Sequence, residues 1–233
     1  MRRTIGTLAV VALLASAIEA GAVEQWRPEP GVTWQIQLQG RPDLSIDAQV
    51  YELDGFDVSE EKVAALHDAG RRVICYMNGG AWEDWRPDAD DFPEEVKGKE
   101  LEGWPGERWL DVGRLDLLQP IMEARLDICV EKGFDAVDFD NVDGYTQDSG
   151  FDISWDDQIA YNRWLAQAAE DRGLAAGLKN DLEQVPELVG DYEFSVNEQC
   201  FLYRECKLLK PFIDANKPVL NIEYELARRR FCP

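Results

Sequence analysis

The sequence predicts an α/β protein of the (β/α)8 TIM-type barrel class, on three observations. Short apolar runs alternate with amphipathic stretches, which favours parallel strands joined by helices. The first run is followed by Gln39-Gly40-Arg41-Pro42, which is not the glycine-rich phosphate turn of an open nucleotide-binding sheet. Polar residues follow directly on the runs, as expected where barrel strands end at an active site. We therefore prefer a closed barrel to an open doubly wound sheet.

The expected strands are seven short apolar runs, each of a length typical of buried β-structure. They cover residues 34–38, 49–53, 73–77, 136–139, 175–178, 194–196 and 219–222. Amphipathic patterns predict helices between them, over residues 59–69, 115–132, 154–172, 181–189 and 205–215. Ser59 is a suitable N-cap for the first helix, and Gly133 and Gly173 end the two longest. Residues 78–113 are rich in Gly, Pro and Trp, which predicts a long loop with one short helix.

The first 22 residues have the organisation of a secretory signal peptide. Arg2 and Arg3 precede an apolar run over residues 5–18, and the small residues Ala20 and Ala22 follow. The run is short for a membrane span, which needs about 20 residues, and an uncleaved anchor is the alternative. The expected product is one barrel domain over residues 23–233, secreted to the extracellular space and free of the membrane after cleavage.

The cysteines fit an oxidising compartment, in which disulfides persist. There are five, all after the predicted signal peptide: Cys75, Cys129, Cys200, Cys206 and Cys232. Cys200 and Cys206 are close enough in sequence to close a small loop, and we expect them to pair. Cys75 lies in an apolar run and is expected to be buried. An odd number leaves one thiol without a partner.

The charge balance narrows the possible partners. The chain has 46 acidic and 24 basic residues, a formal net charge of −22. Such a surface repels phosphate backbones and anionic lipid, so no nucleic-acid partner is expected. The charge favours a cationic ligand, or serves solubility alone. His67, the lone histidine, falls on a predicted surface helix, which argues against triads and zinc sites that need histidine.

Carboxylates collect where the predicted strands end. Those strand ends and the residues directly after them include Asp54, Tyr76, Asp138, Asp140, Asn141, Asp143, Tyr145, Lys179, Asn180, Glu198 and Glu223. Carboxylates without histidine suit glycoside hydrolysis, which needs one as nucleophile or base and another as proton donor. The run from Asp138 to Asp143 is alternatively a metal loop, a helix cap or a structural network. Val142 occupies the fifth position and breaks the calcium-loop spacing, and we expect no metal and no cofactor.

Two further residue types have both a functional and a structural interpretation. Trp82, Trp85, Trp104 and Trp109 lie in the long excursion, where flat rings either stack on sugars or anchor the loop on its scaffold. Lys179 lies among carboxylates, so a structural or substrate-orienting role is preferred to that of a Schiff-base nucleophile.

Several motifs in one order resemble a known family, and the likeness covers residues 34–225. The motifs are WQIQL from Trp34, VICY from Val73, EDWRP from Glu83, GWPGERWLD from Gly103, DNVDGY from Asp140, GLKND from Gly177 and NEQCF from Asn197. Together they resemble glycoside hydrolase family 114, the endo-α-1,4-polygalactosaminidases. The resemblance implies a (β/α)8 barrel and endo-cleavage of galactosamine polymers. It also implies Asp140 as nucleophile and Glu198 as general acid/base, and the Cys200–Cys206 pair resembles a family feature.

The resemblance gives the charge a second use, since unacetylated galactosamine carries an ammonium group. Asp54, Asp143 and Glu223 are our candidates for binding that group, and the other strand-end residues above, Asp138 among them, are expected to bind substrate. The expected partner is a cationic amino-sugar polysaccharide, and the expected state is a monomer. The alternatives are another α-galactoside as substrate, or an inactive barrel that only binds polysaccharide.

One departure from the family concerns the C-terminal part. Similar proteins continue into a further strand and helix, whereas only seven strand runs are visible here. We therefore expect a barrel without its last strand and helix, or one closed by another segment such as residues 109–112. Cys232 is then the expected unpaired thiol.

Overall fold

The computed structural model describes residues 25–231. The predicted signal peptide and Cys232 lie outside the described residues. Within them, the main sheet has seven parallel strands, in the order β1-β2-β3-β7-β8-β9-β10. The strands are β1 (Trp34–Gln37), β2 (Val50–Asp54), β3 (Arg72–Asn78), β7 (Ala136–Asp140), β8 (Ala175–Lys179), β9 (Phe194–Glu198) and β10 (Val219–Ile222).

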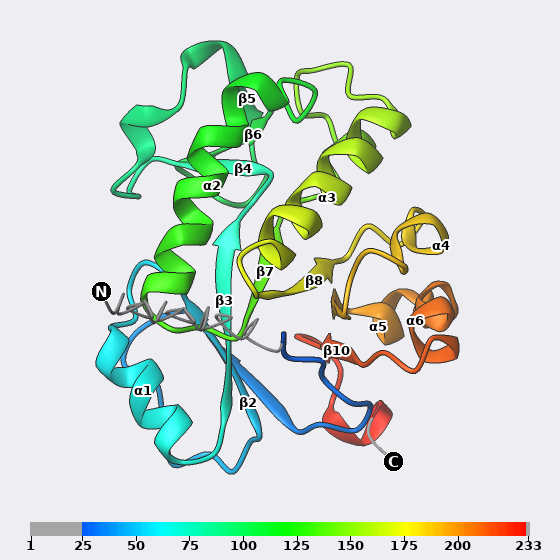
Figure 1. The fold of residues 1–233 in the computed structure, drawn as a ribbon. Coiled ribbons are helices and arrows are strands. Elements are labelled where there is room, and N and C mark those ends of the chain that lie inside the picture. Colours follow the sequence, from blue (N-terminus) through cyan, green and yellow to red (C-terminus); the bar gives the residue numbers. More distant parts are fainter. Residues whose placement is uncertain (1–24, 232–233) are drawn as a thin grey trace, which may run out of the picture.

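This sheet confirms the predicted barrel class and its seven strands (Figure 1). Every neighbouring pair of strands is parallel. From β2 onward, at least one helix lies in the chain between each strand of this sheet and the next. Across the described residues no pairing joins β1 to β10, so the barrel lacks one element. The alternative closure by residues 109–112 is wrong, because β6 (Glu107–Leu110) belongs to a different sheet.

The helices that cover the strands are α1 (Glu60–Asp68), α2 (Leu115–Glu131) and α3 (Trp155–Glu170), with the shorter α4 (Val185–Leu188), α5 (Cys200–Tyr203) and α6 (Lys210–Asp214). Ser154 caps α3 in a reciprocal arrangement with Asp157. His67 lies on the exposed side of α1, as predicted, and its ring contacts Asp135 at 2.8 Å. No helix in the described part of the chain is both long and apolar enough to cross a membrane.

Two predicted helices are shorter than expected. The helix expected over residues 181–189 is reduced to α4, because Asn180 and Asp181 both adopt positive φ, 50° and 45°, and interrupt the helical path. The helix expected over 205–215 is divided into a 3₁₀ turn (Cys206–Leu209) and α6, with Pro211 at the start of the second piece. Proline is suited to a first helical turn and not to a helix interior.

The excursion after β3 is more ordered than the predicted loop with one helix. It contains an antiparallel sheet of β4 (Ala81–Glu83), β5 (Lys97–Glu100) and β6, and two 3₁₀ turns, Ala89–Asp91 and Glu94–Val96. Its strands have three or four residues with many charged side chains, so they show no apolar run. Gly80 lets the excursion leave β3 closely, since a Cβ there would lie 1.7 Å from the carbonyl oxygen of Asn141.

The barrel interior changes from apolar to polar along the strands. Its apolar layer includes Val50, Ile74, Ala136, Ala175 and Phe194. Side chains two residues further along a strand point to the same face. Glu52, Tyr76 and Asp138 therefore form a polar layer above the apolar one. A further two residues along β7, Asp140 points to the same face at the carboxyl end of the strand. A larger apolar cluster fills the space between the strands and α1 to α3. The carboxyl ends are thus the polar end of the barrel.

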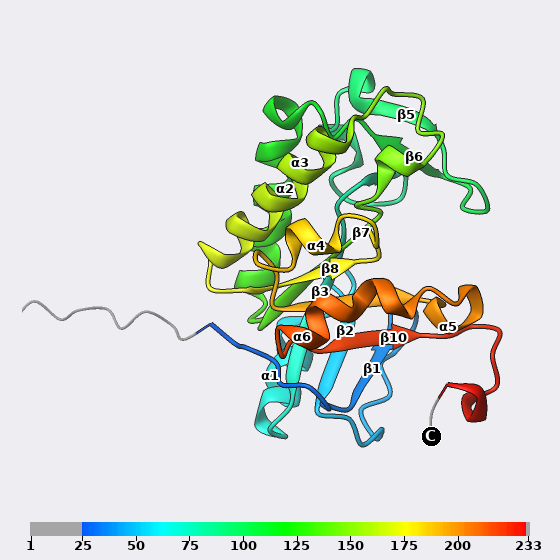
Figure 2. The ribbon, with the colours of Figure 1, turned by 90° about the vertical axis from the view of Figure 1, so that its right-hand side faces the viewer.

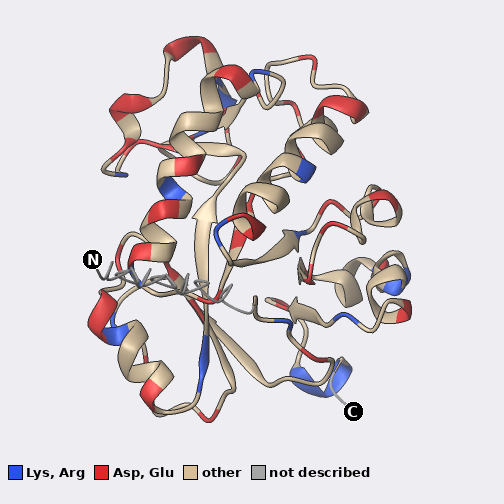
Figure 3. Cartoon of the chain, viewed as in Figure 1, with Lys and Arg blue, Asp and Glu red and all other residues tan. Residues whose placement is uncertain are grey.

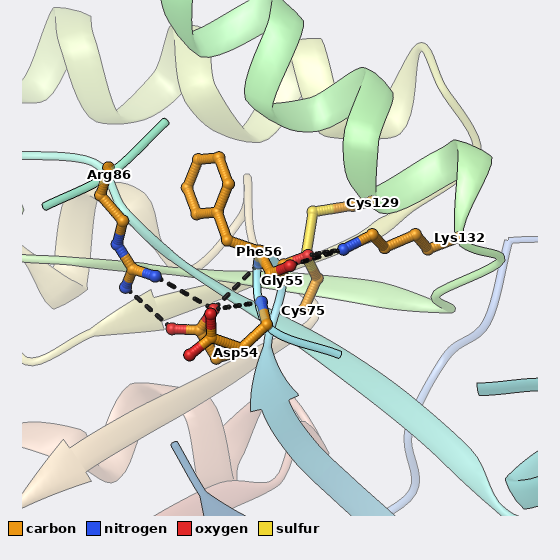
Figure 4. The surroundings of a disulfide bond; sticks show 8 residues. Asp54, Gly55, Phe56, Cys75, Arg86, Cys129 and Lys132 are labelled. Carbon is orange, nitrogen blue, oxygen red and sulfur yellow. Dashed lines mark hydrogen bonds and ion pairs between the residues drawn. A yellow bond between two sulfur atoms is a disulfide. The ribbon is translucent and has the colours of Figure 1, made fainter. Parts of the chain in front are cut away.

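Two disulfides are present in the described chain. Cys200–Cys206 is the predicted pair, and Cys75 is buried as expected. Cys75 also pairs with Cys129, joining β3 to α2 across 54 residues of sequence, which was not predicted (Figure 4). Sequence spacing could not indicate this pair, because a partner so distant in sequence is chosen by the packing of a helix on a strand.

Candidate active site

A cleft of about 440 Å³ opens at the carboxyl ends of the central strands. In Figure 2 the excursion with β5 and β6 and the short α5 lie on the same side of the molecule, to the right. The cleft floor is lined by Tyr76, Asp140, Asn141, Lys179, Asn180 and Glu198, and the excursion adds Glu107, Trp104 and Trp109. Residues from β3, β7, β8 and β9 therefore meet at one place, as the strand-end pattern predicts.

Asp140 is held by three donors at the end of β7. Lys179 Nζ lies 2.9 Å from its Oδ1, the Tyr76 hydroxyl donates to its Oδ2 at 2.6 Å, and the Asn141 backbone N–H donates at 2.9 Å. Burial alone raises the pKa of this carboxyl, but Lys179 and Tyr76 outweigh burial and hold it below the ordinary value. Asp140 is therefore an anion at neutral pH.

Glu198, at the end of β9, is held by a different set of groups. Asn180 Nδ2 donates to Oε2 at 3.1 Å, and the Glu198 backbone N–H donates to Asn180 Oδ1 at 2.9 Å. The Tyr224 hydroxyl donates to Oε1. Lys179 Nζ lies 3.7 Å from Oε2. Three protein groups thus orient one carboxyl whose surface still faces the cleft.

Lys179 connects the two carboxyls. Its side chain is 4% exposed and its ammonium contacts Asp140 and, more distantly, Glu198. Burial lowers the pKa of this amine, but the anions of Asp140, Asp138 and Glu198 raise it well above the ordinary value. A permanently charged ammonium is no nucleophile, so the structure favours the orienting role over Schiff-base chemistry.

A second hollow of about 400 Å³ adjoins the first and shares Asp143, Asn180 and Glu198 with it. It is lined further by Tyr145, Asp181, Glu183, Tyr203 and Glu205. Glu198 therefore lies where the two hollows adjoin. Among the predicted substrate-binding residues, Tyr76, Asn141, Asp143, Tyr145, Lys179 and Asn180 line one hollow or both.

Three residues predicted to bind substrate lie away from both hollows. Asp54 pairs with Arg86 at 2.8 Å and accepts the backbone N–H groups of Phe56 and Asp57, as Figure 4 shows in part. Asp138 is fully buried beneath the cleft. Glu223 accepts the backbone N–H of Phe201 at 2.9 Å. These three carboxyls contact or lie within the scaffold in this structure, and their role in substrate binding stays a prediction.

Several acids in the hollows have pKa values raised toward or above neutral pH. Burial, followed by the nearby Glu83, raises the pKa of Glu107 to about 7. Burial and Asp140 raise the pKa of Asp143 to about 6, and burial and Asp143 raise the pKa of Asp181 to about 8. In residues 25–231 no three His, Cys, Asp or Glu side chains are grouped as metal ligands would be.

The four tryptophans of the excursion divide into two kinds. Trp104, whose residue is 59% exposed, and the buried Trp109 line the cleft. Trp82 donates its ring N–H to the Ala89 carbonyl at 2.9 Å and packs under Lys97, which makes it an anchor. Trp85 is 53% exposed and lines neither hollow.

Sequence reasoning did not select Tyr224, Glu107 or Tyr203 as site residues. Tyr224 follows closely on the seventh apolar run, which is the signal that could have found it. Glu107 and Tyr203 follow no predicted strand, and only the tertiary structure brings them to the hollows.

Comparisons with known proteins found a matching family model and similar solved structures. The model of the glycoside-hydrolase family GH114 matches residues 15–232. Aspergillus fumigatus Ega3, solved in complex with galactosamine, is 43% identical with a TM-score of 0.84, covering 87% of this chain and 81% of that one. The glycoside hydrolase domain of PelA from Pseudomonas aeruginosa is 16% identical with a TM-score of 0.65, covering 84% and 85%, and supports the fold alone. A search of curated proteins gave no significant match.

Proposed function

The chain belongs to glycoside hydrolase family GH114, and from this premise we propose that it cleaves internal α-1,4 linkages in galactosamine-containing polysaccharide. The observation that carries the proposal is the pair of strand-end carboxyls, Asp140 and Glu198, on one buried ammonium at the floor of an open cleft. One carboxyl is held as an anion and the other is oriented by neutral donors. Glycoside hydrolysis needs two carboxyls in these two roles.

The contacts favour a retaining mechanism. Lys179 Nζ lies 2.9 Å from one carboxyl and 3.7 Å from the other, so the contacting oxygens are no farther apart than the sum of these distances. Retaining enzymes hold their two carboxyls at about 5–5.5 Å and inverting enzymes at about 6.5–9.5 Å, so one ammonium in contact with both carboxyls favours retention. In the proposed reaction the carboxylate of Asp140 attacks the anomeric carbon while Glu198, in its protonated form, gives its proton to the leaving oxygen and becomes a carboxylate. Glu198 then takes a proton from the water that releases the sugar from Asp140.

The hollows suit a cationic polymer that passes through the site. They meet at Glu198, so sugar units can lie on both sides of the cleaved bond, as endo-cleavage requires. Asp143 and its neighbours Glu183 and Glu205 supply carboxyls for ammonium groups in the second hollow. The complex of Ega3 with galactosamine supports this substrate class. The apolar run near the N-terminus and the two disulfides support secretion.

The test measures products released from α-1,4-galactosamine oligomers by the purified chain. Glu198→Gln should lower kcat by about 10²–10⁴-fold, as expected for loss of a general acid, and Asp140→Asn by at least as much. Asp127→Asn, on the surface of α2 away from the hollows, is the matched control and should keep full activity.

The outcomes separate the remaining possibilities. Oligomers of several lengths as first products indicate endo-cleavage, whereas single sugars from one end contradict it. If the purified chain melts cooperatively and binds the oligomers but releases no products, the protein is a polysaccharide-binding barrel and not an enzyme. Release from other α-galactosides alone would change the substrate class.

A further inference from the structure

Two carboxyls lie buried beneath the catalytic pair and take no part in the mechanism described above. Glu52 on β2 and Asp138 on β7 are both fully buried. None of their four carboxyl oxygens has a hydrogen-bond donor among the described residues. Unpaired buried carboxylates are costly, so this arrangement needs a physical account.

The two side chains lie on the inner face of the barrel, on the strands that flank β3 on either side. A proton between the two carboxyls would account for the missing donors. Two ionised carboxyls in contact repel strongly in a buried place, whereas one protonated carboxyl donates to its ionised partner. Burial, with Asp138 as the next cause, raises the pKa of Glu52 well above the ordinary value, and burial raises that of Asp138 to about 7. The larger rise is at Glu52, so the geometry and the pKa directions together favour Glu52 as the protonated member and Asp138 as its ionised partner.

Asp138 lies one layer below Lys179 on the inner face of the barrel, because it pairs with Gly177 between β7 and β8 and Lys179 is two residues further along β8. The charged groups that face the pair are Lys179 from β8, Asp140 from β7 and, for Asp138, Glu198 from β9. Tyr192, before β9, is a further titratable group near Asp138. Asp138 is second only to Asp140 among the anions that act on the Lys179 ammonium. The apolar residues Val50 and Ala136 precede the pair by two positions on the same strands.

We propose that Glu52 and Asp138 are positioning residues that share one proton, and that the resulting single anion holds Lys179 between Asp140 and Glu198. The proposal rests on the proposed function and adds to it. Without an anion beneath it, Lys179 is balanced by the two catalytic carboxyls alone. The ammonium then attracts Asp140 more strongly, which makes this carboxylate a weaker nucleophile. The proton on Glu52 limits the pair to one negative charge.

The test compares two conservative changes in the one pair. Glu52→Gln keeps a donor to Asp138 and keeps its anion, so kcat should stay within about threefold of the parent. Asp138→Asn removes the anion beside Lys179, so kcat should fall at least about tenfold with KM within about twofold. The pH–kcat profile of Asp138→Asn should move by at least about half a unit, and that of Glu52→Gln should not. If the pair has only a scaffold role, both substitutions should change the melting temperature, and their pH–kcat profiles should not differ from each other.

A second measurement does not depend on substrate or on the stability of the variants. Carbon-13 spectra of labelled Glu carboxyls in the parent should show a protonated carboxyl at pH 7 whose signal is lost in Glu52→Gln. The proposal is overturned if Glu52 and Asp138 are both ionised at pH 7, or if the two substitutions have equal effects on kcat. An inactive parent with the protonated carboxyl present would contradict the proposed function and leave the shared proton established.

Discussion

At the scale of single residues, the site depends on three turns with left-handed backbone. Asn141, Asn180 and Gln199 have φ of 61°, 50° and 61°, and each directly follows the last residue of a central strand. Asparagine adopts this conformation more readily than most residues. The chain therefore turns at once after Asp140, Lys179 and Glu198. Their side chains stay at the mouth of the barrel, and the Asn141 N–H and the Asn180 side chain remain close enough to bind the two carboxyls.

The first prediction concerns Tyr224, whose hydroxyl donates to Glu198. A hydrogen bond to a charged group contributes about 1.5–3 kcal/mol. Tyr224→Phe should therefore lower kcat roughly 10-fold to 100-fold, measured on galactosamine oligomers, because Glu198 loses part of its orientation. Tyr51→Phe is the matched control, since its hydroxyl bonds to backbone and to Arg71 outside the hollows. If Tyr224→Phe keeps the kcat of the parent, the Tyr224 hydroxyl has no role in orienting Glu198 for catalysis.

At the scale of elements, the small sheet of the excursion builds one wall of the cleft. β6 carries Glu107 and Trp109, and the turn between β5 and β6 carries Trp104. We predict that Trp104→Ala raises KM for the polymer roughly threefold to tenfold with little change in kcat, because a flat exposed ring stacks on sugar. Trp85→Ala removes an equally large, exposed ring outside the hollows and should leave KM unchanged. Equal effects of both changes would contradict the stacking role.

The two disulfides should differ in their effect on stability. Cys75–Cys129 closes a loop with a sequence separation of 54, and Cys200–Cys206 one of 6. The chain-entropy model gives about 4 kcal/mol for the longer loop and about 2 kcal/mol for the shorter. Thermal melting of Cys75→Ala/Cys129→Ala should therefore fall further than that of Cys200→Ala/Cys206→Ala. The opposite order would mean that strain or residual unfolded structure dominates.

At the scale of the whole molecule, stability should fall as pH rises from about 5.5 to about 8.5. The pKa values of Asp143, Glu107 and Asp181, about 6, 7 and 8, are all raised above those of an unfolded chain. The folded state therefore binds more protons in this window, and unfolding becomes easier as they are lost. The lowered pKa of Asp140 affects the stability only at more acidic pH, where this carboxylate becomes protonated.

Calorimetry at constant ionic strength is the measurement for this prediction. Asp181→Asn mimics the neutral carboxyl and can still accept from Asn162, so its melting temperature should depend less on pH than that of the parent. A melting temperature that is constant or rises over this range would contradict the raised pKa values.

The net charge leads to a prediction about salt. Acidic residues are spread over helices and loops around the whole molecule, and Figure 3 shows few basic ones among them. Added salt screens attraction between exposed charges beyond about 10 Å at 0.1 M. The kcat/KM for a cationic galactosamine polymer should therefore fall with salt, while that for an N-acetylated, uncharged oligomer should change much less. The same flat response for both substrates would argue against electrostatic attraction.

Local pattern was enough to predict the order of the elements. The seven runs became the seven strands, and α1, α2 and α3 lie close to their predicted bounds, because periodic burial is written into neighbouring residues. The Cys200–Cys206 pair was predictable for the same reason, since its partners are six residues apart. The small sheet of the excursion was not predictable, because its short strands with charged side chains show no periodic pattern of apolar residues.

The sequence by itself determined the barrel class, the acidic surface and the gathering of carboxyls at the strand ends. Only the tertiary structure decided which of them face the cleft: Asp140 and Glu198 do, whereas Asp138 is buried below and Asp54 is paired with Arg86. It also decided the Cys75–Cys129 pair and the contact of Tyr224 with Glu198. The physical reason is that alternation along a strand sets the face of a side chain, whereas its depth and partners depend on strands and loops distant in sequence.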